Sequence, residues 1–280
     1  MNDHDDTRDS DLDTLLGEPF SSAWRRAPGA GGAAARERLV QRLAASRAAE
    51  AGMVTARRRR LARHAPAEGV VLQTLYAAET GRGLRPGEPL RARLVELQPG
   101  ARLAAGMLDD EAVLRARQRE WLLLRGDVRE ATTGERLGVR DYHVTPANHA
   151  TPDWASEGGA LLFLRESELA ASAGDAAFTV HDDEAGWPAY APGIARRVLW
   201  QRDGQAAMLY RAAPGAQVPP HAHGHDEECL MVDGELFLDD TLLLPGDYQL
   251  ARAGTGHRIT ATDTGVVIYA HGDLDLRFIA

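Results

Sequence analysis

Hydrophobic residues in this chain fall into short runs, and from about residue 69 onward Gly, Pro or Asp separates one run from the next. Examples are VVLQTLY, EWLLLRGDV, CLMVDGELFL and GVVIYA, which are rich in β-branched and aromatic residues. Short runs between turn signals are typical of a sandwich or barrel, whereas βαβ units would place helical patterns between the strands. We therefore predict an all-β fold from residue 69 to the end of the chain.

The pattern ahead of these strands is different. Over residues 33–66, Leu39, Val40 and Leu43 recur at helical spacing among Ala, Arg, Glu and Gln, which predicts a helical segment. Residues 1–32 are charged and then rich in Gly, Ala and Pro, which is typical of a disordered tail.

Comparison of the chain with itself indicates an internal repeat. Three segments recur in the same order, and the second pair aligns Gly126 with Gly234. The pairs are LVELQPGA with LYRAAPGA, REWLLLRGDV with EECLMVDGEL, and RDYHVTPANHAT with GDYQLARAGTGH. We therefore predict two copies of one β-domain, over residues 69–167 and 190–280.

The second copy contains a cluster of candidate metal ligands in PPHAHGHDEECLMVDG, residues 219–234. Alternate residues of a strand share a face, so His221 and His223 are expected to point the same way. Glu227 opens the next apolar run, and His257 follows a glycine-rich turn. Three imidazoles and one carboxylate would suit a divalent first-row metal. His225 falls where a turn is expected to begin.

These residues resemble the two motifs of the cupin superfamily. The first motif matches Gly215, His221, His223, Glu227 and Gly234; the second matches Gly246, Gly254 and His257, with Arg252 where the family usually has proline and Ala261 where it has asparagine. The resemblance implies two jelly-roll barrels in tandem after a short helical segment. It also implies that His221, His223, Glu227 and His257 hold the metal. Glu228 is the alternative carboxylate ligand. We prefer Glu227, because the spacing between Glu227 and Gly234 is that of the motif.

The first copy lacks this ligand set. In the aligned positions it carries Gly106, Leu108, Arg119 and Thr151, so we predict a degenerate cupin without a metal. Its expected roles are packing, dimerisation or the enclosure of an apolar ligand. We expect His143 and His149 to be structural or surface residues.

The paired Glu-Glu and the short link between the motifs resemble the cupin domain of ChrR-type anti-sigma factors. This resemblance implies a regulatory or sensory protein that binds a sigma factor or a small-molecule ligand. However, the helical zinc motif of that family is missing here. The alternative is a dioxygenase-type enzyme acting on a small organic substrate. Either function would use one divalent ion (zinc, iron, manganese or nickel, with zinc favoured), and the resemblance also implies a homodimer.

Composition and charge narrow the range of possible functions and cellular locations. The formal net charge of −9 argues against general binding to nucleic acid or to an anionic membrane. The one cysteine, Cys229, excludes disulfides within the chain and fits a reducing compartment. No secretory leader or transmembrane run is evident, so we expect a cytoplasmic protein. Cys229 lies in an apolar strand and is expected to be a small core residue; the alternative is a thiolate that reaches the metal or senses oxidation.

Overall fold

The computed structural model describes residues 30–50 and 52–279 and divides the chain into two compact units, Met1–Gly52 and Met53–Ala280. The first unit contributes one described helix, α3 (Ala30–Glu50), in which Gln41 donates a hydrogen bond to Glu37 one turn earlier. Residues 1–29 of the tail predicted over 1–32 lie outside the described residues; its last three residues belong to α3, so the predicted boundary is corrected to position 30. No helix in the described ranges combines the length and hydropathy needed to cross a bilayer.

The structure corrects the extent of the helix expected over residues 33–66. The helix ends at Glu50, and the following residues form β1 (Met53–Ala56), a 3-10 turn η1 (Arg58–Arg60) and β2 (His64–Ala67). Val54 and Thr55 are β-branched, and β1 forms backbone pairs along a sheet edge that is distant in sequence. Local helical propensity gives way to this pairing.

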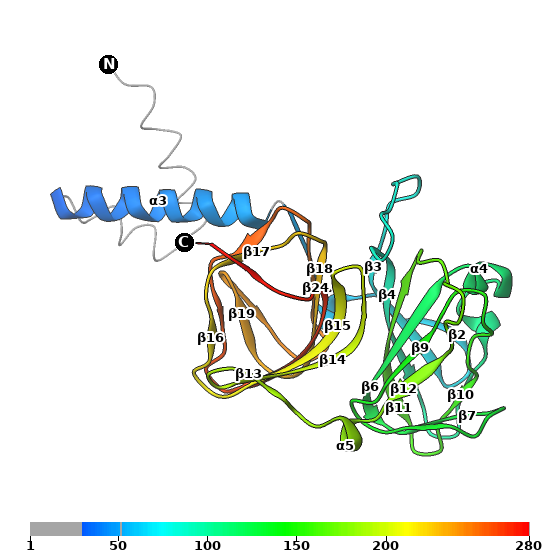
Figure 1. Ribbon diagram of the computed structural model, residues 1–280. Helices are drawn as coiled ribbons and strands as arrows, with labels where there is room; N and C mark the ends of the chain where they lie inside the picture. Colours follow the sequence, from blue (N-terminus) through cyan, green and yellow to red (C-terminus); the bar gives the residue numbers. More distant parts are fainter. Residues whose placement is uncertain (1–29, 51, 280) are drawn as a thin grey trace. The chain divides into compact units, whose positions relative to one another are not determined.

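The N-terminal barrel consists of a seven-stranded and a four-stranded antiparallel sheet (Figure 1). A short helix, α4 (Glu111–Arg115), and the 3-10 turn η2 (Ala105–Met107) lie in its connections, and a second short helix, α5 (Asp182–Ala185), lies in the segment that leads to the next barrel. In spatial order, the large sheet contains β12 (Phe178–Val180), β9 (Tyr142–Thr145), β6 (Gln118–Gly126), β11 (Ala160–Ser167), β4 (Pro89–Leu97), β3 (Val70–Ala77) and β2; the small sheet contains β5 (Arg102–Leu103), β10 (Trp154–Ala155), β7 (Val128–Glu130) and β8 (Arg136–Leu137).

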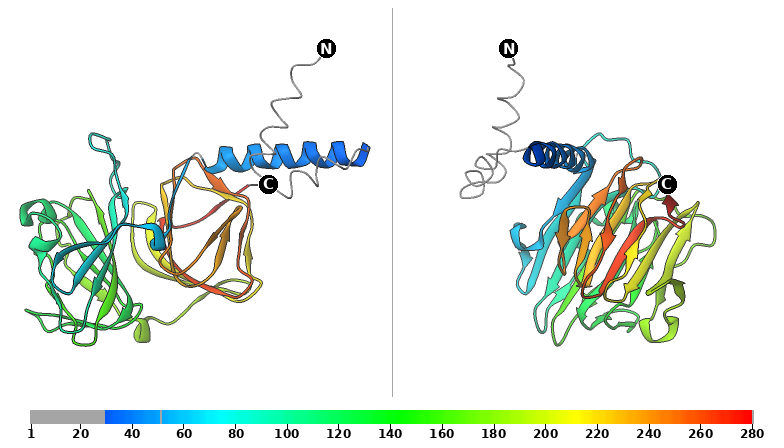
Figure 2. Two further views of the ribbon diagram at one scale, coloured as in Figure 1. Left: turned by 180° about the vertical axis from the view of Figure 1, so that it is seen from behind. Right: turned by 90° about the vertical axis from the view of Figure 1, so that its left-hand side faces the viewer.

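The C-terminal barrel repeats this arrangement (Figure 2). Its large sheet contains β1, β21 (Tyr248–Ala251), β18 (Glu227–Gly234), β24 (Val266–Asp273), β15 (Gln205–Ala212), β14 (Ile194–Arg202) and β13 (Ala189–Ala191); its small sheet contains β16 (Gln217–Val218), β23 (Thr260–Ala261), β19 (Leu236–Leu238) and β20 (Thr241–Leu243). A third sheet of β22 (Gly256–His257), β17 (His221–Ala222) and β25 (Arg277–Phe278) has no counterpart in the described part of the first barrel. The all-β fold with two barrels in tandem is thus confirmed.

Each barrel borrows an edge strand from a segment outside its own repeat. β1 precedes the first barrel in sequence but pairs with β21 of the second, with Thr55 opposite Gln249. β12 lies between the repeats and pairs with β9 of the first, with Thr179 opposite His143. Of these two strands, β1 crosses from ahead of the first barrel to the second, and it links the two barrels within the unit Met53–Ala280.

The glycines that the sequence comparison aligned have the same structural role. Gly126 and Gly234 both have positive φ, at 78° and 76°. A Cβ atom would lie 2.0 Å from the carbonyl oxygen of Gly159 at the first and 2.1 Å from that of Gly265 at the second. Because only glycine tolerates both conditions, each marks the same sharp departure from the large sheet.

A buried polar network joins the barrels. Arg165 of β11 binds Glu120 of β6 at 2.9 Å and also contacts Glu228 of β18 in the other barrel. Tyr142 donates to Glu120 and Tyr248 donates to Glu228, each at 2.7 Å. All five side chains are buried, and they lie against an apolar cluster drawn from both barrels. The barrels therefore share one core in addition to the link made by β1.

Candidate metal centre

Two candidate ligands face each other across a short strand pair. His221 of β17 lies directly opposite His257 of β22. The neighbouring Gly256 permits this approach, because a Cβ atom there would lie 2.3 Å from the carbonyl oxygen of His221. Both imidazoles are almost fully buried.

The other two candidates flank the turn after β17. His223 lies before the turn, and Glu227 begins β18. Asp273 holds the turn by accepting from the backbone of Gly224 and by contacting Nδ1 of His225 at 2.6 Å. His225 thus points to Asp273 and lies outside the ligand cluster, as the expected turn implied.

The four side chains converge. The ring centroids of His221, His223 and His257 lie 5.1–5.6 Å from one another. Candidate ligand atoms of His221, His223 and Glu227 all lie within 4.8 Å of one another. His257 is outside that tighter group, although its ring packs against both other imidazoles. Converging imidazole and carboxylate groups can hold zinc, iron, manganese or nickel.

Hydrogen bonds orient two of the imidazoles. Nδ1 of His221 lies 3.0 Å from the carbonyl oxygen of Pro219, and Nδ1 of His257 lies 3.2 Å from Oδ2 of Asp239. Each contact leaves Nε2 available as a ligand, which is the usual arrangement around metal-binding histidines. Nε2 of His223 is buried and has no hydrogen-bond partner among the described residues. An unpaired buried nitrogen is costly in a protein interior, and a metal ion would satisfy it.

The electrostatics of the cluster keep its carboxylate ionised. Burial opposes ionisation of Glu227, but the adjacent His223, together with His257 and His221, lowers the pKa of Glu227 to about 2. Burial lowers the pKa of His221. Burial has the same tendency at His223, but Glu227, 3.3 Å from its Nδ1, raises the pKa of that imidazole overall.

The structure separates the two adjacent glutamates. Glu227 faces the imidazoles, whereas Glu228 points to the other side of β18 and joins the network with Arg165 and Tyr248. Cys229 is buried in the apolar core of the C-terminal barrel, and burial raises its thiol pKa. The cysteine therefore has the properties of the expected small core residue.

Arg252 replaces the proline of the second motif and stabilises the same loop differently. Its guanidinium donates to Asp226 at 2.8 Å and to the Tyr76 hydroxyl of the first barrel at 3.0 Å. Asp226 in turn accepts from the backbone nitrogen of Ala253 at 2.9 Å. Charge-assisted hydrogen bonds thus fix the loop that leads to His257.

The first barrel carries an arginine where the second has Glu227. Arg119 is fully buried and donates to the carbonyl oxygens of Leu114, Pro146 and His149 at 2.8–3.1 Å, and to the Thr151 hydroxyl. Its guanidinium therefore contacts Thr151, the residue aligned with His257. His143 and His149 make local bonds to Thr179 and to the Ala147 carbonyl.

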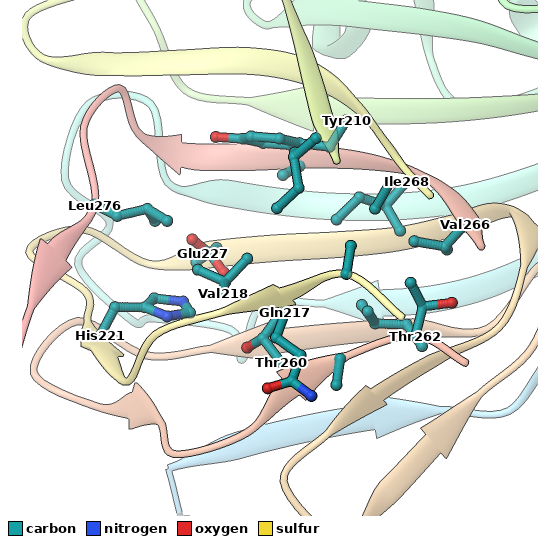
Figure 3. Close-up of a pocket in the computed structure, with 16 residues that line it drawn as sticks. Tyr210, Gln217, Val218, His221, Glu227, Thr260, Thr262, Val266, Ile268 and Leu276 are labelled. Carbon is teal, nitrogen blue, oxygen red and sulfur yellow. The ribbon is translucent and has the colours of Figure 1, made fainter. Parts of the chain in front are cut away.

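A small cavity reaches the cluster from inside the C-terminal barrel. Its volume is about 70 Å³, which is room for only a few water-sized groups. Figure 3 shows His221 and Glu227 at one end and Thr262 and Val266 at the other. Most other lining residues are apolar, including Ile194, Val218, Leu236, Ile268 and Leu276.

Sequence reasoning missed Asp239, the residue that contacts His257. Asp239 has a positive φ of 54°, and its Oδ1 accepts from the backbone of Arg258 at 2.9 Å and of Ile259 at 3.3 Å. The Asp-Asp pair in a tight turn was the signal that could have found it, because aspartate tolerates this conformation and binds backbone nitrogens. Its proximity to His257 depends on nonlocal strand pairing.

Residues 175–275 match the sequence family described as "ChrR Cupin-like domain". A comparison with curated protein sequences gave no significant match. The family match covers the linker strand and nearly all of the C-terminal barrel, including the four candidate ligands.

Solved structures are similar over both barrels. E. coli protein YlbA has a TM-score of 0.59 at 12% identity, covering 79% of this chain and 90% of that one. A Nostoc punctiforme chain with a provisional dioxygenase assignment has a TM-score of 0.58 at 12% identity, covering 81% and 85%. The formate complex of Lactobacillus farciminis oxalate decarboxylase has a TM-score of 0.54 at 14% identity, covering 81% and 88%. At these identities the likeness establishes the fold alone.

Proposed function

We propose that this protein, in which residues 175–275 match a ChrR cupin-like domain and two barrels follow each other in tandem, binds one divalent metal ion through His221, His223, Glu227 and His257. The observation that carries the proposal is that candidate ligand atoms of His221, His223 and Glu227 lie within 4.8 Å of one another, and that the buried Nε2 of His223 has no hydrogen-bond partner in the described part of the chain. When bound, the metal would supply a Lewis acid and a template for a small ligand.

The chain's own residues prepare the site for that ligand. Pro219 and Asp239 fix two imidazole rings before any metal binds. The apolar cavity beside His221 and Glu227 would exclude bulk water and admit only a small molecule. We propose zinc as the ion, although the donor set also accommodates iron, manganese and nickel.

The role that we assign to this site is sensory: a small ligand enters the cavity and alters the metal-bearing barrel. The ChrR cupin-like match over residues 175–275 supports this role. A sigma factor is the proposed partner. Co-purification of a sigma factor with the tagged full chain, released when the small ligand is added, is the expected result.

Dioxygenase-type catalysis is the second candidate function. It is favoured by the cavity, because His221 and Glu227 line it and a substrate there would lie beside the metal ligands. Oxygen uptake by iron-loaded protein, screened over diketones and phenolic compounds, distinguishes the two functions. Turnover would establish the enzyme, whereas the sensory role predicts no oxygen consumption with any of these compounds.

Replacing both His221 and His223 with alanine should abolish metal binding, because the ion would lose two of its four ligands. Elemental analysis of the purified protein measures this directly. The matched control is the double variant His143→Ala and His149→Ala in the first barrel, which should retain the wild-type metal content. Equal metal content in both double variants would refute the ligand assignment.

Asp239→Asn should weaken metal binding by about 10- to 100-fold, because loss of an orienting carboxylate typically has this effect. Competition with a chromogenic chelator gives the affinity. Asp240→Asn is the control, since the adjacent side chain is exposed and faces Arg258. If both variants bind metal as the wild type does, Asp239 does not position His257.

A further inference from the structure

A second cluster of charged residues lies inside the N-terminal barrel, away from the proposed metal centre. Arg91 and Arg93 of β4 contact Glu166 of β11 at 2.6 and 3.1 Å. Arg91 also contacts Asp109 at 2.7 Å. Arg117 lies 3.3 Å from Asp109 and 3.6 Å from Glu166. Three guanidinium groups thus share two carboxylates.

The positive charge of this cluster is only partly compensated. Arg93 is 4% exposed, and its Nε has no hydrogen-bond partner in the part of the chain that the structure describes. Burial outweighs the attraction of Glu166 and lowers the pKa of Arg93 to about 10. Nη1 of Arg93 donates to the Leu108 carbonyl oxygen at 3.0 Å and Nη2 donates to Glu166 at 3.1 Å, so Nε is the donor that a further acceptor would satisfy.

Arg119 adds to the excess of positive charge. It is fully buried on β6, and Glu166 is the carboxylate whose charge acts most strongly on it. Within residues 30–50 and 52–279, however, no carboxylate lies within ion-pair distance of Arg119, which is held by carbonyl oxygens and a hydroxyl. Around Glu166, the guanidinium groups therefore outnumber the carboxylates.

A pocket opens onto this cluster. Its volume is about 370 Å³, several times that of the cavity in the C-terminal barrel. Arg91 and Arg93 line part of it and provide the charged surface. The remaining surface includes both polar and apolar groups, among them Thr74, Leu72, Met107 and Leu108.

We propose that the N-terminal barrel binds an organic carboxylate, with the carboxylate on Arg91 and Arg93 and the apolar body against Leu72, Met107 and Leu108. Arginine recognises a carboxylate through paired, charge-assisted hydrogen bonds. The apolar surface favours an organic acid over an inorganic anion, and the pocket is large enough for a six-carbon body. Loss of the metal ligands in this barrel would thus accompany a change of ligand.

Benzoate is the probe, titrated by calorimetry into the wild-type full chain. We expect a dissociation constant of about 1 mM or tighter, and a weakening of at least about tenfold in Arg93→Met. Methionine is the residue that the second barrel carries at the aligned strand position, Met208. Arg102→Met is the control, because it removes an exposed arginine of the same barrel and should bind benzoate as the wild type does.

Two further variants distinguish the arginine-lined pocket from the metal centre as the benzoate site. Thr74 lies opposite Arg93 on the neighbouring strand, so Thr74→Trp should block the pocket while every charged side chain of the cluster is kept; it tests the proposal even if Arg93→Met fails to fold. The metal-site variant His221→Ala/His223→Ala should bind benzoate normally. Loss of binding in that variant but not in Arg93→Met or Thr74→Trp would place benzoate at the metal centre and overturn the proposal. Equal affinity for inorganic phosphate, or no binding at all to the wild type, would also overturn it.

Discussion

Arg165→Met is expected to lower the free energy of unfolding by about 3–5 kcal/mol, the usual cost of leaving a buried charge without its partner. Arg165 is 1% exposed and lies between Glu120 of its own barrel and Glu228 of the other. Its loss would leave two buried carboxylates without a cation. Urea denaturation followed by tryptophan fluorescence measures the change.

The pH dependence of this variant provides a second test. In the wild type, burial opposes ionisation of Glu120, but Arg165 lowers the pKa of that carboxyl to about 2. Burial alone raises a carboxyl pKa, so without Arg165 the folded-state pKa should exceed that of the unfolded chain. The variant should therefore lose stability as the pH rises from about 5 to about 8, because the unfolded chain releases the carboxyl protons more readily than the folded one.

The control for Arg165→Met is Arg125→Met, which removes an exposed arginine that lies 3.7 Å from Glu96. An exposed ion pair of this kind contributes about 0–1 kcal/mol. Stabilities of Arg165→Met and Arg125→Met that agree within about 1 kcal/mol would show that the buried network does not hold the barrels together.

Glu227→Gln and Glu228→Gln should affect different properties, metal affinity and fold stability respectively, although the two residues are adjacent. Glu227→Gln should weaken metal binding by more than about 100-fold, because even an orienting residue contributes about 10- to 100-fold. Glu228→Gln should retain the wild-type metal affinity. It should instead destabilise the fold by about 1.5–3 kcal/mol, since Arg165 loses one charged hydrogen-bond partner.

Chelator competition and thermal denaturation of the two variants measure both effects. The pair is internally matched, because the same change of side chain is made on opposite faces of β18. Loss of metal from Glu228→Gln with retention in Glu227→Gln would reverse the assignment of the two glutamates.

The sequence was sufficient for the architecture and for the candidate ligands because both depend on regular patterns. Turn residues between apolar runs indicated the strands, and aligned Gly126 and Gly234 occupy the same sharp turn. The spacing of His221, His223, Glu227 and His257 selected side chains that do converge. Spacing to Gly234 also distinguished Glu227 from Glu228.

Other features depend on contacts between distant segments. The composition of the residues after Glu50 still favours a helix. These residues form β1 instead, because they pair with β21, which lies far along the chain. Arg252 departs from the proline of the motif. Its hydrogen-bond partners, Asp226 and Tyr76, lie far from it in the sequence, so no local pattern indicated these contacts. The buried network of Glu120, Arg165 and Glu228 was also missed. No local sequence pattern distinguishes these three residues from other charged residues in strands.

Diffraction data from crystals of the full chain, collected on both sides of the absorption edge of the metal found by elemental analysis, test the central claim most directly. The account predicts one anomalous peak, in the C-terminal barrel, within bonding distance of His221, His223, Glu227 and His257. A peak elsewhere in the chain, or a metal-loaded crystal in which these side chains do not contact the ion, would contradict it.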